Sequence, residues 1–229
     1  MKKVLIASSL ALNLVLITFA AWVLSGRASG LELIAAIELA HQRWVSQFEI
    51  LEVGPGDTVF LGDSITEGGA WHELFPFSNV RNRGIGGDTT TGVMARLDQI
   101  TRGRPKQVFL LIGANDLRLG TSPNVVVTNI LAIVAQIHKA SPQTQIFVQS
   151  VLPSAQYFQE SAEVLNAALA AAVAGKANWV NLYPLFLDGA GVSIDDSLSN
   201  DELHLHGRGY QVWRDAIAHL VAVREDNRS

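Results

Sequence analysis

Residues 59–69 read VFLGDSITEGG, an apolar run that breaks into a small, polar turn with Ser64 at its centre. An apolar run followed at once by glycine and aspartate predicts a buried strand that turns into a helix. Open α/β sheets place their functional sites at the carboxyl ends of such strands. Ser64 is therefore a candidate nucleophile, although a serine in this position also suits the N-cap of a helix that begins near Thr66.

Strand and helix patterns alternate along the chain on both sides of this turn. Strands are predicted at residues 58–61, near Val80, and at 108–112, 145–151 and 179–182, and helices at 31–52, 90–100, 123–140, 160–174 and 209–223. Strands separated by helices pair in parallel and carry helices on both faces of the sheet. The sequence therefore predicts an α/β fold, a three-layer α/β/α sandwich around a central parallel sheet of about five strands.

The composition narrows the class of protein. The chain has 229 residues, of which 48% are hydrophobic, enough for one core, and we expect one domain over residues 27–229. A net charge of -4 with scattered Lys and Arg argues against a nucleic-acid-binding surface, which requires clustered positive charge. The absence of cysteine excludes thiol catalysis, cysteine-ligated zinc and disulfides.

The N-terminal segment has the pattern of a membrane helix. Lys2 and Lys3 precede residues 4–24, which carry no charged side chain, and a helix of that length spans a hydrocarbon core of about 30 Å. We expect residues 1–26 to be a membrane anchor or a signal segment, and the indistinct cleavage site favours an uncleaved anchor. Basic residues before the run would place the following domain outside the cytoplasm, in the periplasm or the extracellular space, and secreted if the segment is cleaved.

Polar residues gather directly after the predicted strands and before the last helix. The segments are Asp63-Ser64, residues 83–90 (RGIGGDTT), residues 113–116 (GAND) and residues 200–206 (NDELHLH). Because the carboxyl ends of parallel strands meet at one edge of a sheet, these segments can converge on one cleft. Acyl transfer by a serine needs a base, a partner that orients the base, and donors for the oxyanion. The four segments contain candidates for each of these roles.

Other interpretations of these segments carry less support. Gly84-x-Gly86 resembles the start of a dinucleotide fingerprint, but Thr89 stands where the third glycine belongs. His204 and His206 could be metal ligands, yet neither a glutamate-flanked helical pair nor a cysteine accompanies them, so no metal is expected. Asn115 could also be a turn residue or a helix cap.

Four short blocks of the sequence resemble those of the SGNH, or GDSL-type, esterase and lipase superfamily. The blocks are Gly62-Asp63-Ser64, Gly87, Gly113-x-Asn115-Asp116 and Asp201-x-x-His204, and they stand in the order of that superfamily. The resemblance extends from about Arg43 to Trp213. Within the superfamily the chain is most similar to the branch that contains the catalytic subunits of intracellular platelet-activating-factor acetylhydrolase, as in the phrases at residues 71–75 (WHELF) and 84–90 (GIGGDTT).

This resemblance implies a flavodoxin-like SGNH hydrolase fold and a role for each matching residue. Ser64 would be the nucleophile, His204 the general base and then acid, and Asp201 the residue that orients His204. The backbone N–H groups of Ser64 and Gly87 and the side-chain amide of Asn115 would hold the oxyanion, without metal or cofactor. Spacing alone leaves His206 as an alternative base, because it too lies close to Asp201.

The expected function is a serine esterase that hydrolyses short-chain acyl or O-acetyl esters of small molecules, glycans or lipids. Three alternatives remain open: an acyltransferase that passes the acyl group of Ser64 to a sugar hydroxyl, a lysophospholipase, and a catalytically silent module that binds glycans or lipids in the same cleft. The N-terminal apolar segment departs from the intracellular enzymes of the similar branch. The oligomeric state is left open.

Overall fold

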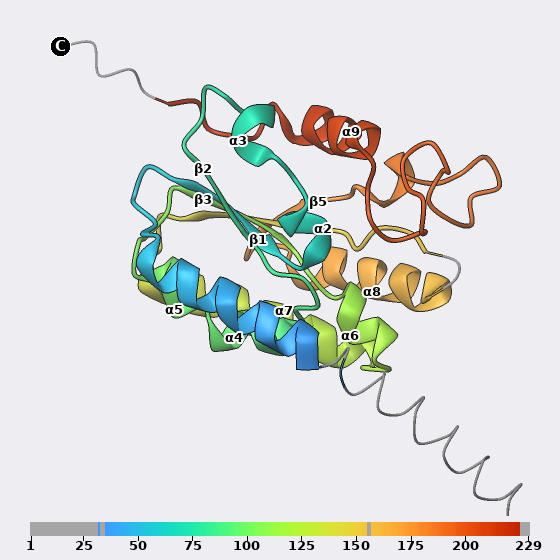
Figure 1. The fold of residues 1–229 in the computed structure, drawn as a ribbon, viewed down its shortest axis with the longest axis horizontal. Coiled ribbons are helices and arrows are strands. Elements are labelled where there is room, and N and C mark those ends of the chain that lie inside the picture. The colour runs from blue at the N-terminus through green and yellow to red at the C-terminus, as the bar shows by residue number, and fades with distance from the viewer. Residues whose placement is uncertain (1–31, 33–34, 155–156, 225–229) are drawn as a thin grey trace, which may run out of the picture. The chain divides into compact units, whose positions relative to one another are not determined.

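The computed structural model describes residue 32, residues 35–154 and residues 157–224 (Figure 1). The chain divides into two compact units, Met1–Gln42 and Arg43–Ser229, and the whole sheet belongs to the second. The predicted membrane segment, residues 1–26, and its boundary lie outside the described residues. Among the residues that are described, no helix combines the length and hydrophobicity that crossing a membrane requires.

The second unit is built on one sheet of five parallel strands. These are β1 (Thr58–Gly62), β2 (Val80–Gly84), β3 (Gln107–Leu111), β4 (Gln145–Gln149) and β5 (Asn178–Val180). They lie in the order β2-β1-β3-β4-β5, which is the flavodoxin-like order. Gly62 at the end of β1 is in register with Gly84 of β2 and Leu111 of β3, so the carboxyl ends of these three neighbouring strands lie level. The predicted α/β class and the parallel sheet are confirmed.

Helices cover both faces of the sheet, as the alternation of patterns predicted. One layer contains α4 (Thr90–Ala95), α5 (Asp98–Thr101), α7 (Pro123–Ala140) and α8 (Gln159–Ala172), and the other contains α3 (Trp71–Leu74) and α9 (Gly207–Ile217) (Figure 1). A further helix runs over residues 35–50. In α7 the buried side chains include Val126, Ile130, Val134 and Ile137, which recur at the spacing of an amphipathic helix.

An aromatic stack fills the core beneath α3 and α9. Phe60, Phe109 and Phe147 are in register on three neighbouring strands and therefore point to the same face. Their rings stack at centroid distances of 5.1 and 4.5 Å, and Trp71 stacks on Phe60 at 4.0 Å. Trp213 of α9 packs edge-on against Trp71 at 4.7 Å. This core holds α9, and the loop that precedes it, over the carboxyl edge of the sheet.

Some predicted boundaries were wrong. The single helix expected at residues 90–100 is two helices, α4 and α5, because the chain leaves helical geometry at Arg96, with φ −113°. The Arg96 guanidinium is drawn into the interior, where Nε donates to Asp88 Oδ2 at 2.8 Å. The final helix ends at Ile217 instead of continuing to residue 223. The short helices α3 and α6 (Ala114–Arg118) were not predicted, since so few residues show no helical period.

Candidate active site

Ser64 stands at the first position of the short helix α2 (Ser64–Glu67), directly after β1. The N-cap is Asp63, whose Oδ1 accepts a hydrogen bond from the Ile65 N–H at 3.0 Å. The alternative in which Ser64 itself caps a helix beginning near Thr66 is therefore wrong. Because the cap is supplied by Asp63, the Ser64 hydroxyl is left for another contact.

Polar side chains from three other elements fix the backbone of α2. The Asn82 amide on β2 donates to three carbonyl oxygens at the end of the helix, at 2.9 to 3.1 Å. Trp71 Nε1 donates to Thr66 O and Tyr210 Oη donates to Ile65 O, both at 2.8 Å. These bonds satisfy carbonyl groups that the end of a helix leaves without partners. The backbone beneath Ser64 is thus held by β2, α3 and α9 together.

The turn between β1 and α2 is too tight for larger residues beside it. A Cβ on Gly62 would lie 2.2 Å from Leu111 O, and one on Gly84 would lie 2.1 Å from the Glu67 nitrogen. Neither neighbour is a flexible side chain, so both positions require glycine. The glycine of the Gly-Asp-Ser block is explained by this close approach of β3.

Three side chains form a continuous chain of hydrogen bonds across the carboxyl edge of the sheet. Ser64 Oγ lies 2.9 Å from His204 Nε2, and His204 Nδ1 lies 2.7 Å from Asp201 Oδ2. An ionised carboxylate only accepts, which assigns the ring proton to Nδ1 and leaves Nε2 to accept from the serine hydroxyl. Of the two candidate histidines the structure brings His204 to Ser64, whereas His206 serves as the N-cap residue of α9.

A tight turn brings Asp201 and His204 together. Asp201 Oδ1 accepts from the backbone N–H of Leu203 at 3.0 Å and of His204 at 2.7 Å, and Glu202 between them adopts a left-handed φ of 57°. Burial raises the pKa of Asp201, but hydrogen bonds from the His204 ring and from these two N–H groups outweigh it and lower the pKa to about 2. Asp201 is therefore a carboxylate at neutral pH.

The three predicted oxyanion donors follow β1, β2 and β3. Gly87 has a left-handed φ of 78° and is exposed, and its N–H, like that of Ser64, has no acceptor among the described residues. Asn115 is buried on α6, where Nδ2 donates to Asp88 O at 2.9 Å. That bond uses one of the two amide hydrogens and leaves the other. The N-cap of α6 is Gly113, so Asn115 is not a helix cap.

Buried carboxylates support the loops that carry these donors. Asp116 accepts from the Thr90 N–H at 2.9 Å and from Thr90 Oγ1 at 2.5 Å, which joins α6 to α4. Asp88 pairs with Arg96, and both side chains are at least 98% buried, with exposures of 1% and 2%. Asp88 and Asp116 belong to the polar segments at residues 83–90 and 113–116, but nothing in the pattern of those segments indicates these partners.

Asp63, next to the nucleophile in the sequence, is a buried carboxyl group with a raised pKa. The pKa of Asp63 is raised to about 7, chiefly by burial and also by the nearby charges of Asp88 and Asp116, against the lowering effect of the Ile65 N–H. Its second oxygen, Oδ2, is buried and has no hydrogen-bond partner within the part of the chain that the structure describes. The protonation state of Asp63 therefore depends on the burial and the nearby charges at the N-terminus of α2.

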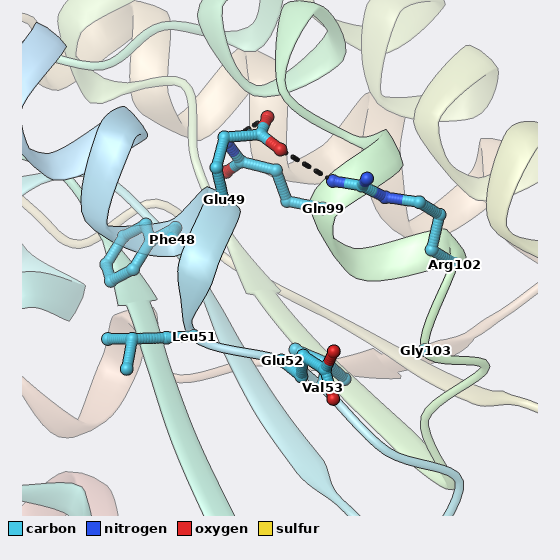
Figure 2. Close-up of a pocket in the computed structure, with 8 residues that line it drawn as sticks. All are labelled: Phe48, Glu49, Leu51, Glu52, Val53, Gln99, Arg102 and Gly103. Atoms are coloured by element: carbon cyan, nitrogen blue, oxygen red, sulfur yellow. Dashed lines mark hydrogen bonds and ion pairs between the residues drawn. The ribbon is translucent and has the colours of Figure 1, made fainter.

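Of two cavities on the surface, one lies apart from the predicted site residues and the other is lined by Asp201. One of about 310 Å³ lies beside the end of the helix over residues 35–50, where Glu49 accepts from Gln99 and Arg102 (Figure 2). None of the predicted site residues lines it. Another, of about 380 Å³, is bordered by Asp201 and His206 and so lies against the carboxylate end of the hydrogen-bond chain. Within the part of the chain that the structure describes, no group of three or more His, Asp or Glu side chains could hold a metal.

Comparison with known proteins shows the family to which the chain is related. The model of the GDSL-like lipase/acylhydrolase family matches residues 60–212. Platelet-activating factor acetylhydrolase IB subunit alpha1 from Bos taurus is 32% identical over 181 residues, covering 74% of this chain and 75% of that protein. The alpha2 subunit from Rattus norvegicus is 34% identical over 187 residues, covering 73% and 79%.

Solved structures of related proteins share the fold. A protein from Streptococcus pneumonia, provisionally described as a platelet activating factor, superposes with a TM-score of 0.74 and 27% identity over 84% of this chain and 98% of that one. A GDSL-like lipase from Bacteroides thetaiotaomicron gives a TM-score of 0.67 and 25% identity over 78% and 95%. The resemblance that the four sequence blocks predicted is confirmed. The chain belongs to the GDSL-like lipase/acylhydrolase family and is a hydrolase.

Proposed function

We propose that the protein is a serine esterase that hydrolyses esters of short acyl groups, O-acetyl esters among them, through an acyl intermediate on Ser64. The observation that carries this proposal is the chain of contacts from Ser64 Oγ to His204 Nε2 at 2.9 Å and from His204 Nδ1 to Asp201 at 2.7 Å. A nucleophile bonded to a base that is itself oriented by a third group is the arrangement that acyl transfer requires.

The first half of the reaction forms the acyl-enzyme. Ser64 Oγ attacks the ester carbonyl carbon while His204 Nε2 takes the hydroxyl proton, and the carbonyl electron pair moves to oxygen. The negative charge of Asp201 stabilises the imidazolium that results. The N–H groups of Ser64 and Gly87 and the free amide hydrogen of Asn115 donate to the oxyanion. When the carbon–oxygen bond to the alcohol breaks, His204 returns its proton to the leaving oxygen.

The second half releases the acid and restores the serine. Water loses a proton to His204 Nε2 and attacks the acyl carbon, and the same donors hold the second oxyanion. Collapse of this intermediate returns the proton to Ser64 Oγ and releases the acyl group as a carboxylic acid. The nucleophile of the first half, the base and the oxyanion donors are residues of the chain, and water is the nucleophile of the second half.

The preference for short acyl groups rests on the relatives. The mammalian proteins that are 32 to 34% identical are named acetylhydrolases, and the chain covers about three quarters of their length, 75 to 79%. The family model matches residues 60–212, a range that includes the loops that follow β1 to β3. We therefore assign an acetyl or similarly small acyl group to the site.

A panel of aryl esters tests this proposal. The full chain is assayed on 4-nitrophenyl esters from acetyl to dodecanoyl, an acetylated sugar and a lysophospholipid, with the Ser64→Ala protein as the blank. Catalytic efficiency should be highest for the shortest esters, and a steady increase toward dodecanoyl would overturn the acyl assignment. Activity that survives in the blank would remove the serine mechanism. A product formed only on addition of an acceptor alcohol would identify a transferase.

A further inference from the structure

Arg118 lies one helical turn after Asn115 on α6 and faces the same edge of the sheet. Its Nη1 donates to Asn115 Oδ1 at 3.5 Å, as expected for positions three residues apart on one helix. The Arg118 side chain is exposed, whereas Asn115 is buried. A guanidinium group therefore stands in solvent directly beside the side chain that is proposed to hold the oxyanion.

A second loop orients this guanidinium. Arg118 Cζ lies 4.9 Å from the ring centroid of Tyr157, which belongs to the loop between β4 and α8. The face of a tyrosine ring attracts a cation without neutralising it. The planar group is thus held between the loops that follow β3 and β4, with its charge retained.

Among the described residues Arg118 has no acidic partner, in contrast to four other arginines of the domain. Ion pairs join Arg81 to Asp57, Arg96 to Asp88, Arg102 to Glu49 and Arg214 to Asp215. Within residues 35–154 and 157–224, no carboxylate lies within ion-pair distance of Arg118. A guanidinium presents five N–H donors in a planar fork that matches a carboxylate or a phosphate. Most of those donors remain available to a ligand.

The geometry argues against a purely supporting role for Arg118. Charge-assisted N–H···O bonds that hold a partner in place are typically about 2.7 to 2.9 Å long. The bond to Asn115 Oδ1 is 3.5 Å, whereas Asn115 Nδ2 is already held by Asp88 O at 2.9 Å. Asp88 therefore accounts for the orientation of the Asn115 amide.

We propose that Arg118 binds an anionic group of the substrate, a carboxylate or a phosphate carried close to the scissile ester. This inference rests on the proposed esterase function and specifies its substrate class as negatively charged esters. The anion displaces water from the guanidinium while Tyr157 keeps the fork in position. Phenyl or alkyl parts of the same substrate can contact Leu119, which is 75% exposed next to Arg118.

Matched neutral and charged esters test the proposal on the full chain. Phenyl acetate is compared with 4-acetoxybenzoate and with 4-acetoxyphenyl phosphate, which carry a carboxylate or a phosphate on the alcohol part of the ester. In the same way, 4-nitrophenyl acetate is compared with 4-nitrophenyl hydrogen glutarate, which carries a carboxylate on the acyl group. Arg118→Gln should raise KM for at least one charged ester by about tenfold or more, as expected for loss of a bond to a charged group. KM and kcat for the neutral esters should stay within about twofold, and Arg118→Lys should keep part of the preference.

Two controls make the outcome decisive. Arg102→Gln removes an exposed charge at the Glu49 pair, away from Asn115, and should leave every ratio of charged to neutral ester unchanged. If Arg118→Gln raises KM equally for neutral and charged esters, or raises it for neither, the proposal is overturned. If no ester is hydrolysed, the proposed function fails, and binding of benzoate and of phenyl phosphate to the Ser64→Ala protein is measured instead. If the Ser64→Ala protein binds these anions and the double variant with Arg118→Gln binds them more weakly, the anion site is supported. If the two proteins bind equally, or if neither binds, the anion site is overturned.

Discussion

Glu67 Oε2 accepts a hydrogen bond from the backbone N–H of Gly86 at 2.5 Å, which ties the helix that carries Ser64 to the loop that carries Gly87. Glu67 is the last residue of α2, and Gly86 immediately precedes the glycine whose N–H is proposed to hold the oxyanion. One side chain thus links the nucleophile to a donor that comes from a different strand. A small displacement of a donor from the oxyanion lowers its contribution to the rate.

Replacement of Glu67 should lower turnover more than stability. Glu67→Ala releases the loop at Gly86, and we expect kcat for 4-nitrophenyl acetate to fall by about tenfold to a hundredfold with KM within about twofold. Glu67→Gln should retain most activity, because the amide oxygen can still accept from the N–H. Glu73→Ala on α3, whose side chain is 76% exposed, is the matched control. An unchanged kcat in Glu67→Ala would show that the tether does not position Gly87.

Removal of the nucleophile or of its base should abolish hydrolysis to the same extent. Ser64→Ala and His204→Ala should each lower kcat by several orders of magnitude, and the double variant should be hardly worse, since the two residues act as a unit. His206→Ala should keep most activity, because the contact to Ser64 is made by His204. Steady-state kinetics on an aryl acetate measures all four proteins. Turnover by Ser64→Ala above one tenth of the wild-type value would contradict the assignment.

Asn115→Ala separates a catalytic from a structural role for the amide. Loss of one oxyanion donor typically lowers kcat by about a hundredfold to a thousandfold. The variant also loses the bond to Asp88 O, which should lower the free energy of unfolding by about 1 kcal/mol. Kinetics and urea denaturation of the same preparation measure the two effects. A change in stability with kcat intact would leave Asn115 with a structural role alone.

Asp63 should make the stability of the fold depend on pH. Its pKa is raised from 3.8 to about 7 in the folded protein, so the folded state binds more protons than the unfolded state between these values. The stability contributed by protonated Asp63 is fully present below about pH 4 and is lost as the pH rises toward 7.

Asp63→Asn should remove that loss while keeping an N-cap residue on α2. Between pH 4.5 and 7.5 the free energy of unfolding of the variant should fall less steeply than that of the wild type, by up to about 1.4 kcal/mol per pH unit. Urea denaturation at a series of pH values gives both slopes, and Asp215→Asn on the exposed end of α9 serves as the control. Parallel slopes in wild type and Asp63→Asn would contradict the raised pKa.

The membrane segment remains a prediction, because residues 1–26 lie outside the described part of the chain. Lys2 and Lys3 before an uncharged run predict that the N-terminus stays in the cytoplasm and that Ser64 lies outside it. In a bacterial host with an inner membrane, protease added to intact spheroplasts should digest the catalytic domain. Full protection, or recovery of the intact chain in the cytosolic fraction, would count against this topology.

Most of the fold could be predicted from local patterns. The fully buried strands β1 and β3 are apolar runs, and the helix predicted at residues 123–140 has the observed bounds of α7, because its apolar residues keep one period throughout. The break at Arg96 could not be predicted in this way. It depends on the buried Asp88 carboxylate, and a sequence period carries no information about a partner that another loop supplies.

The sequence by itself determined the α/β class, the family, and the residues of the four blocks that the chain has in common with that family. Each of these can be recognised in segments of a few residues. Only the tertiary structure decided that His204 and not His206 reaches Ser64, that Glu67 ties α2 to the loop of Gly87, and that Arg118 stands beside Asn115 with Tyr157 against it. The physical reason is that Ser64 and His204 lie 140 residues apart and meet only through the packing of α9 and of the loop before it over the sheet. Spacing along the chain describes local geometry, whereas contacts between distant segments follow from the arrangement of strands and from the aromatic core that holds α9 in place.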